Sequence, residues 1–116
     1  MSEQNKLTLL NGNAEIAREN YEGFLDLCTE DTTWEFVGDV TLRGKKEVRK
    51  WMQENYKEPP TVTVDHLLPS GNFLTAIGTV TMKNTSGRPV DYHYSDTWEF
   101  RGELMHKVTA FVIEKK

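Results

Sequence analysis

Four segments that read as β-strands follow one another after Pro59-Pro60, and they limit the folds open to this chain. They cover residues 61–68, 73–83, 90–100 and 104–113. The third, Val90–Phe100, alternates most clearly, with apolar side chains at every second position as in a strand with one buried face. Short connections that each contain glycine join the segments. The second half of the chain therefore predicts an antiparallel sheet of consecutive strands.

The first half of the chain is expected to be mainly helical. Hydrophobic spacing predicts helices over residues 6–17, over 21–28 and from 44 to the Pro59-Pro60 break, with a strand over 32–37. Asn20 is the expected cap of the second helix, and Thr29-Glu30-Asp31 is a polar break after it. An apolar stripe supports the third helix, formed by Val48, Trp51, Met52 and Tyr56.

Helices first and strands later predict an α+β fold, with three helices packed on one face of a curved antiparallel sheet. The 116 residues fit one domain, 1–116, with a single core. The net charge is −4 and the two signs are mixed, which argues against a nucleic-acid partner. The apolar runs are too short for a bilayer and the N-terminus lacks a secretion pattern, so a cytoplasmic protein without a membrane partner is expected.

Cysteine and histidine usage gives no metal-site signature, and we predict neither a metal nor another cofactor. Cys28, the only cysteine, is expected on the second helix as a small buried hydrophobe. His93 has the strand parity that predicts an outward position, and His106 is expected to be a hydrogen-bonded structural residue. His66 shares parity with Val62, Val64 and Leu68, which favours an inward position.

Asp96 is the most unusual residue of the predicted sheet. It lies in the middle of a strand face that otherwise carries Val90, Tyr92, Tyr94, Trp98 and Phe100. Burial disfavours a charged carboxylate, so an inward Asp96 needs a partner or keeps its proton, and perturbed acids gather at functional sites. The alternative is an Asp that is solvated or paired with a cation near a strand end. An inward His66 could exchange a proton with a substrate beside Asp96, or be held structurally by a hydrogen bond.

Aromatic side chains recur on the predicted inward faces. They are either simple core or the lining of a pocket for a small hydrophobic or aromatic ligand, and the polar tips of Tyr and Trp favour a pocket slightly. The candidate ligand-binding residues are Trp34, Phe36, Trp51, Tyr56, Tyr92, Tyr94 and Trp98.

Three motifs resemble one superfamily, the cone-shaped α+β fold of nuclear transport factor 2, ketosteroid isomerase and the SnoaL-like polyketide cyclases. They are Tyr21–Phe36, which runs through an acidic break into a strand bearing Trp; Leu42–Val48, similar to the entry into the third helix; and Ser95–Leu104, like the paired final strands. The resemblance covers nearly the whole chain. It implies a fold more specifically than a function, because this fold hosts enzymes and non-catalytic adaptors.

The resemblance implies that Asp96 faces a pocket and matches the acid with which ketosteroid isomerases hydrogen-bond an oxyanion, an Asp kept protonated by an apolar site. By local alignment, the general base of those isomerases would fall at Phe36 and their oxyanion-hole Tyr at Gly12. Neither residue can do that work, so a ketosteroid isomerase mechanism is not expected.

Three functions remain open. The first is a cofactor-independent isomerase, cyclase or dehydratase that uses Asp96, with His66 or a Tyr hydroxyl, as acid or acid/base on a small hydrophobic carbonyl compound. The second is a non-catalytic ligand-binding module. The third is a dimerisation or interaction domain, because relatives with this fold pair through their sheets, and a homodimer is expected.

Overall fold

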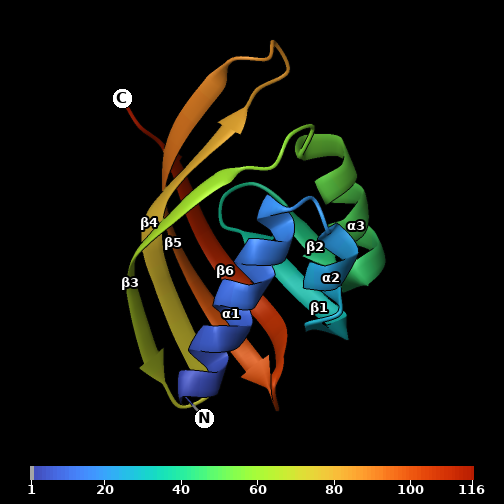
Figure 1. Cartoon of the computed structure of the whole chain (residues 1–116), viewed down its shortest axis with the longest axis vertical. Coiled ribbons are helices and arrows are strands. Elements are labelled where there is room, and N and C mark those ends of the chain that lie inside the picture. The colour runs from blue at the N-terminus through green and yellow to red at the C-terminus, as the bar shows by residue number, and fades with distance from the viewer. Residues whose placement is uncertain (1) are drawn as a thin grey trace.

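Six strands form one curved sheet in the order β2-β1-β6-β5-β4-β3. The computed structural model describes residues 2–116, and Figure 1 shows the sheet curling around the helices, which lie against one of its faces. The helices are α1 (Ser2–Ala17), α2 (Tyr21–Leu25) and α3 (Gly44–Asn55). The strands are β1 (Cys28–Phe36), β2 (Thr41–Arg43), β3 (Thr61–Ser70), β4 (Phe73–Lys83), β5 (Pro89–Arg101) and β6 (Leu104–Glu114). The predicted α+β architecture is confirmed.

The four strands from β3 to β6 pair antiparallel with their neighbours in sequence, as predicted. The sequence predicted a strand in the region of β1, but it did not predict which strand β1 would pair with. It pairs in parallel with β6, so Trp34 lies opposite Val108 and Phe36 opposite Ala110. β2 pairs with the other edge of β1 and is only three residues long, too short to show a pattern in the sequence.

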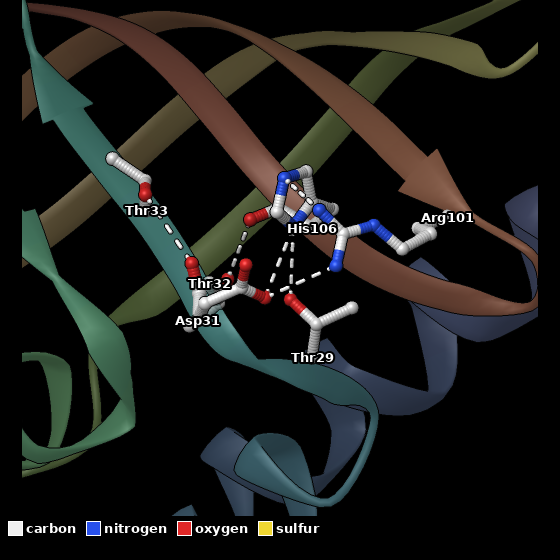
Figure 2. Close-up of polar contacts among 6 residues, drawn as sticks. All are labelled: Thr29, Asp31, Thr32, Thr33, Arg101 and His106. Atoms are coloured by element: carbon white, nitrogen blue, oxygen red, sulfur yellow. Dashed lines mark hydrogen bonds and ion pairs between the residues drawn. The ribbon is translucent and has the colours of Figure 1, made fainter.

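The predicted second helix was too long. α2 ends at Leu25, and the residues expected as the end of the helix and a polar break form the start of β1. Polar side chains fasten this start to β6, because Thr32 Oγ1 donates to the His106 carbonyl oxygen at 2.9 Å (Figure 2). Cys28 is buried as predicted but lies on β1, not on a helix, and burial raises the pKa of its thiol to about 12.

His106 is the hydrogen-bonded structural residue that the sequence predicts. Figure 2 shows it between Arg101 and β1: Arg101 Nη2 donates to His106 Nε2 at 2.9 Å, and Nδ1 lies 3.0 Å from Thr29 Oγ1. A guanidinium only donates, so Nε2 accepts and the proton of the neutral ring is on Nδ1. Arg101 Nη1 also lies 3.3 Å from Asp31 Oδ1. One polar cluster therefore links the start of β1 to the end of β5 and the start of β6.

Local interactions set where the shorter helices begin. Asn20 Oδ1 accepts the Gly23 N–H at 3.1 Å, which is the predicted cap of α2. At α3, the Glu47 carboxylate accepts the Arg43 N–H at 2.7 Å, and Gly44 has the positive φ of 85° that a glycine adopts without strain. Apolar residues on the inner faces of the helices then complete the core against the sheet, among them Leu9, Ile16, Phe24, Leu25, Val48 and Met52.

Candidate functional site

The concave face of the sheet and the helices enclose a cavity of about 360 Å³. That volume lies at the lower end of the range for small-molecule sites. All seven aromatic residues named from the sequence line it: Trp34, Phe36, Trp51, Tyr56, Tyr92, Tyr94 and Trp98. Exposed lining residues such as Val37, Asp39, Asn55 and Val62 mark its mouth.

Asp96 lies on the cavity wall between two small residues. In the sheet register, Ala76 of β4 is opposite Asp96 on one side and Ala110 of β6 on the other. Both alanines are buried, with exposed fractions of 2% and 3%. Because neither has a side chain beyond Cβ, the cavity extends to the carboxyl group.

The environment of Asp96 disfavours its charge. Burial raises the pKa of the Asp96 carboxyl from 3.8 to about 7. Its Oδ1 atom is buried without a hydrogen-bond partner among the described residues, so no neighbouring donor stabilises the anion. A substantial fraction of the carboxyl is therefore protonated near neutral pH and can donate a hydrogen bond.

The charge of Asp96 affects the pKa values of two tyrosines that line the cavity. Burial, and secondly the Asp96 carboxylate, raise the pKa of Tyr94 to about 12 and that of Tyr56 well above its usual range. Both phenols therefore stay neutral. Tyr94 Oη donates to the Thr63 carbonyl oxygen at 2.7 Å, so its proton is already used within the protein.

The aromatic wall is a set of edge-to-face contacts. Trp34 contacts Phe24, Trp51 and Trp98 in this way, with ring centroids 5.7, 6.1 and 6.1 Å apart. Phe36 and Trp51 stack at 5.0 Å. Trp34 Nε1, although buried, has no hydrogen-bond partner among the described residues.

The inward position predicted for His66 is wrong. β3 has a register irregularity between Val64 and His66, and beyond it His66 lies opposite Ile77 while Leu67 lies opposite Ala76. One extra residue in a strand turns all later side chains to the other face. His66 is therefore exposed on the outer face, away from Asp96, and Leu67 takes the inward place. His93 is exposed, as predicted.

Several lining residues were not identified from the sequence. Ala76 and Ala110 have the right strand parity, but only the register shows that they flank Asp96. Asn13, Asp39 and Asn55 come from α1, a turn and the end of α3, where no local pattern indicates a cavity. Asn55 Nδ2 donates to the Trp51 carbonyl oxygen at 2.9 Å.

Within residues 2–116, no three His, Cys, Asp or Glu side chains gather closely enough to hold a metal ion. None of the helices in this part of the chain is long and apolar enough to cross a membrane.

Solved structures with the same fold include proteins of several descriptions. SalBIII, an epoxide hydrolase/cyclase-like enzyme with a role in pyran ring formation in the polyether salinomycin, has a TM-score of 0.87 and 16% identity over 95% of this chain and 91% of its own. A protein of Kribbella flavida provisionally described as a ketosteroid isomerase has a TM-score of 0.82 and 21% identity, with 99% and 82% of the two chains covered. At such identities the likeness shows the fold alone.

An NTF2-like protein of unknown function from Burkholderia pseudomallei is 18% identical with a TM-score of 0.81, covering 92% of this chain and 88% of its own. No curated protein sequence matches the chain. The family model of the SnoaL-like domain matches residues 12–108, which is most of the sequence. The resemblance seen in the sequence is thereby confirmed, and the protein belongs to the SnoaL-like domain family.

Proposed function

We propose that the cavity binds a small hydrophobic carbonyl compound and that Asp96 is a general acid in an isomerase, cyclase or dehydratase reaction without a cofactor. The observation that carries this proposal is the buried Asp96 carboxyl on the wall of an aromatic cavity. Its pKa is raised to about 7, and its Oδ1 has no hydrogen-bond partner within residues 2–116. A neutral carboxyl donates to a carbonyl oxygen and stabilises the charge that develops there on enolisation.

The cavity suits a ligand of one or two rings. Its volume is small, its walls are largely aromatic, and the groups at its mouth include Asp39 and Asn55. Solved structures of the same fold include a cyclase-like enzyme and a protein provisionally described as an isomerase, but their identities are too low to identify a reaction or a substrate.

1-Tetralone and its hydrocarbon counterpart tetralin give a direct test. We expect 1-tetralone to bind more tightly at pH 6 than at pH 8.5, because the protonated Asp96 donates to the ketone and the carboxylate repels it. Tetralin, which has no oxygen, should lack this preference, and Asp96→Asn should remove it for the ketone. Thermal-shift and calorimetric titrations measure both. Equal affinity for 1-tetralone at the two pH values would contradict the role of Asp96.

Exchange of the α-protons of 1-tetralone in D2O, followed by NMR, tests catalysis separately. We expect the wild-type protein to accelerate exchange and Asp96→Asn to lose that acceleration. Binding without acceleration would instead support the second function, a non-catalytic ligand-binding module.

One observation favours that second function. His66, the residue expected to complete an acid/base pair with Asp96, faces the opposite side of the sheet. Phe36, which the resemblance aligns with the isomerase base, lines the cavity but has no group that can accept a proton. Two neutral phenols, Tyr56 and Tyr94, lie close enough to Asp96 for its charge to raise their pKa values.

A further inference from the structure

Two residues that line the cavity carry a buried polar atom without a hydrogen-bond partner among residues 2–116. Among the described residues, three buried side-chain atoms have no hydrogen bond, and Asp96 Oδ1 and Trp34 Nε1 belong to residues that line the cavity. The third, Asn5 Oδ1, comes from a residue of α1 outside the lining. Buried polar groups in proteins are nearly always hydrogen-bonded, so two exceptions in one cavity point to a group that enters it.

Trp34 is held rigidly. Its ring packs against Phe24 and Trp98 at interplanar angles of 89° and 90°. The ring of Trp51 packs against it as well, at an interplanar angle of 65°. Its side chain is buried, with an exposed fraction of 5%. The indole N–H therefore cannot rotate out to water, and its direction is fixed before any ligand arrives.

We propose that the Trp34 indole N–H is a second hydrogen-bond donor of this site, and that the preferred ligand is a cyclic compound with two acceptor oxygens, one facing Asp96 and one facing Trp34. This inference rests on the proposed function, the binding of a carbonyl compound beside Asp96. An indole nitrogen donates and does not accept, so it selects an acceptor oxygen and rejects a hydroxyl or amine proton.

The sheet places the two donors over different parts of the cavity. Trp34 comes from β1 and Asp96 from β5, with β6 between them, so their strands are about 10 Å apart. Along β6 they lie opposite Val108 and Ala110, two residues from each other. Each donor therefore selects its own oxygen.

N-Methylphthalimide and 2-methylisoindolin-1-one test this inference. They share one skeleton and differ in that one carbonyl oxygen of the first is replaced by two hydrogens in the second. We expect N-methylphthalimide to bind the wild-type protein more tightly at pH 6. In Trp34→Phe the ratio of the two dissociation constants should fall by about threefold to tenfold, the usual effect of one neutral hydrogen bond.

Phe73→Leu is the control, because Phe73 is another aromatic residue of the sheet but is exposed on β4 and does not line the cavity. We expect it to keep the wild-type ratio. The ¹H–¹⁵N spectrum shows whether each variant is folded, since the chain has three tryptophans: two indole resonances should remain in Trp34→Phe and three in Phe73→Leu.

The outcomes separate the two proposals. If both compounds bind and Trp34→Phe leaves their ratio unchanged, the second donor is overturned while ligand binding beside Asp96 stands. If neither compound binds the wild-type protein, the proposed function and this inference both fall.

Discussion

Asp96 is kept neutral by what surrounds it at the scale of single residues. Alanines flank it across the sheet, and Tyr94 and Trp98 flank it along the strand. None of these side chains offers a cation, and the Tyr94 proton is committed to Thr63. Raising the carboxyl pKa from 3.8 to about 7 corresponds to about 4 kcal/mol that would be spent on ionising the buried group.

This residue predicts an unusual dependence of stability on pH. Between pH 4 and pH 7 the folded state holds a proton on Asp96 that the unfolded state has released, so the free energy of unfolding falls as pH rises through this window. We expect wild-type protein to be less stable at pH 8.5 than at pH 5.5, by about 2 kcal/mol from this group, since pH 5.5 lies about 1.5 units below the folded pKa. Urea unfolding at the two pH values measures it.

Asp96→Asn isolates the contribution of this carboxyl, because every other titratable group is retained. The variant should be more stable than wild type at pH 8.5. Its free energies of unfolding at pH 5.5 and pH 8.5 should also differ much less than those of wild type. Identical pH profiles for the two proteins would mean that Asp96 ionises as freely in the folded chain as in the unfolded one.

The sequence predicted this residue but not its surroundings. Strand parity alone placed Asp96 among aromatic side chains, since residues two apart share a face. The flanking Ala76 and Ala110 could not be assigned, because the register between strands is not written in either strand alone. His66 was misplaced for a related reason: nothing in residues 61–68 indicates the irregularity that reverses the parity after Val64.

At the scale of elements, β3 is shaped by a contact from β5. Tyr94 passes over Gly78 of β4 to donate to the Thr63 carbonyl oxygen, next to the irregularity that turns His66 outward. A Cβ at Gly78 would lie 2.0 Å from that oxygen and 2.9 Å from Tyr94 Oη. The glycine is therefore required by close approach of the backbones.

We expect Gly78→Ala to lower the free energy of unfolding by about 2 kcal/mol or more, since the strands must separate to admit the methyl group. Tyr94→Phe should cost about 1 kcal/mol, the loss of one hydrogen bond. Ser95→Ala, on the outer face of β5, is a suitable neutral control. Chemical denaturation compares the three, and a stable Gly78→Ala variant would show that β3 and β4 can move apart freely.

The row of small residues beside Asp96 predicts a second effect. Ala110→Leu should fill the space next to the carboxyl and abolish the binding of 1-tetralone, at a cost of about 1–3 kcal/mol in stability. Thr109→Leu adds a comparable side chain one position away, on the outer face, and should leave binding intact. Calorimetric titration of both variants distinguishes a blocked cavity from general damage to β6.

Most elements were predictable because each has a local signature. β4 begins and ends where its alternation does. α3 begins at Gly44 and ends at Asn55, next to Tyr56, the last residue of its apolar stripe, and before the Pro59-Pro60 break. The start of β1 could not be predicted, because Thr29 and Thr32 are held in the strand by contacts with His106, more than seventy residues away. A polar stretch fixed by such distant partners is indistinguishable in sequence from a loop.

At the scale of the whole molecule, the outer face of the sheet remains uncovered. Phe111 and Ile113 of β6 have exposed fractions of 49% and 65%, and the register aligns them with Ser95 and His93 of β5. We propose that this face joins two copies of the chain, since exposed apolar side chains on an uncovered sheet face favour association.

We expect Phe111→Glu to convert a dimer to a monomer in sedimentation experiments at micromolar concentration. Leu7→Glu is the control, because Leu7 is comparably exposed, at 55%, but lies on α1 away from this face. A wild-type protein that sediments as a monomer under these conditions would rule out the proposed homodimer.

The parallel pairing of β1 with β6 has a consequence for how the chain reaches its fold. β6, which lies between β1 and β5 in the sheet, is synthesised after both, so β1 and β2 have no partner that ties them to β5 until residues 104–114 are available. Closing a loop of this length is slow relative to forming local hairpins. The β3–β5 meander is thus free to form early during synthesis, whereas the cavity wall carrying Trp34 takes shape only after residues 104–114 have left the ribosome.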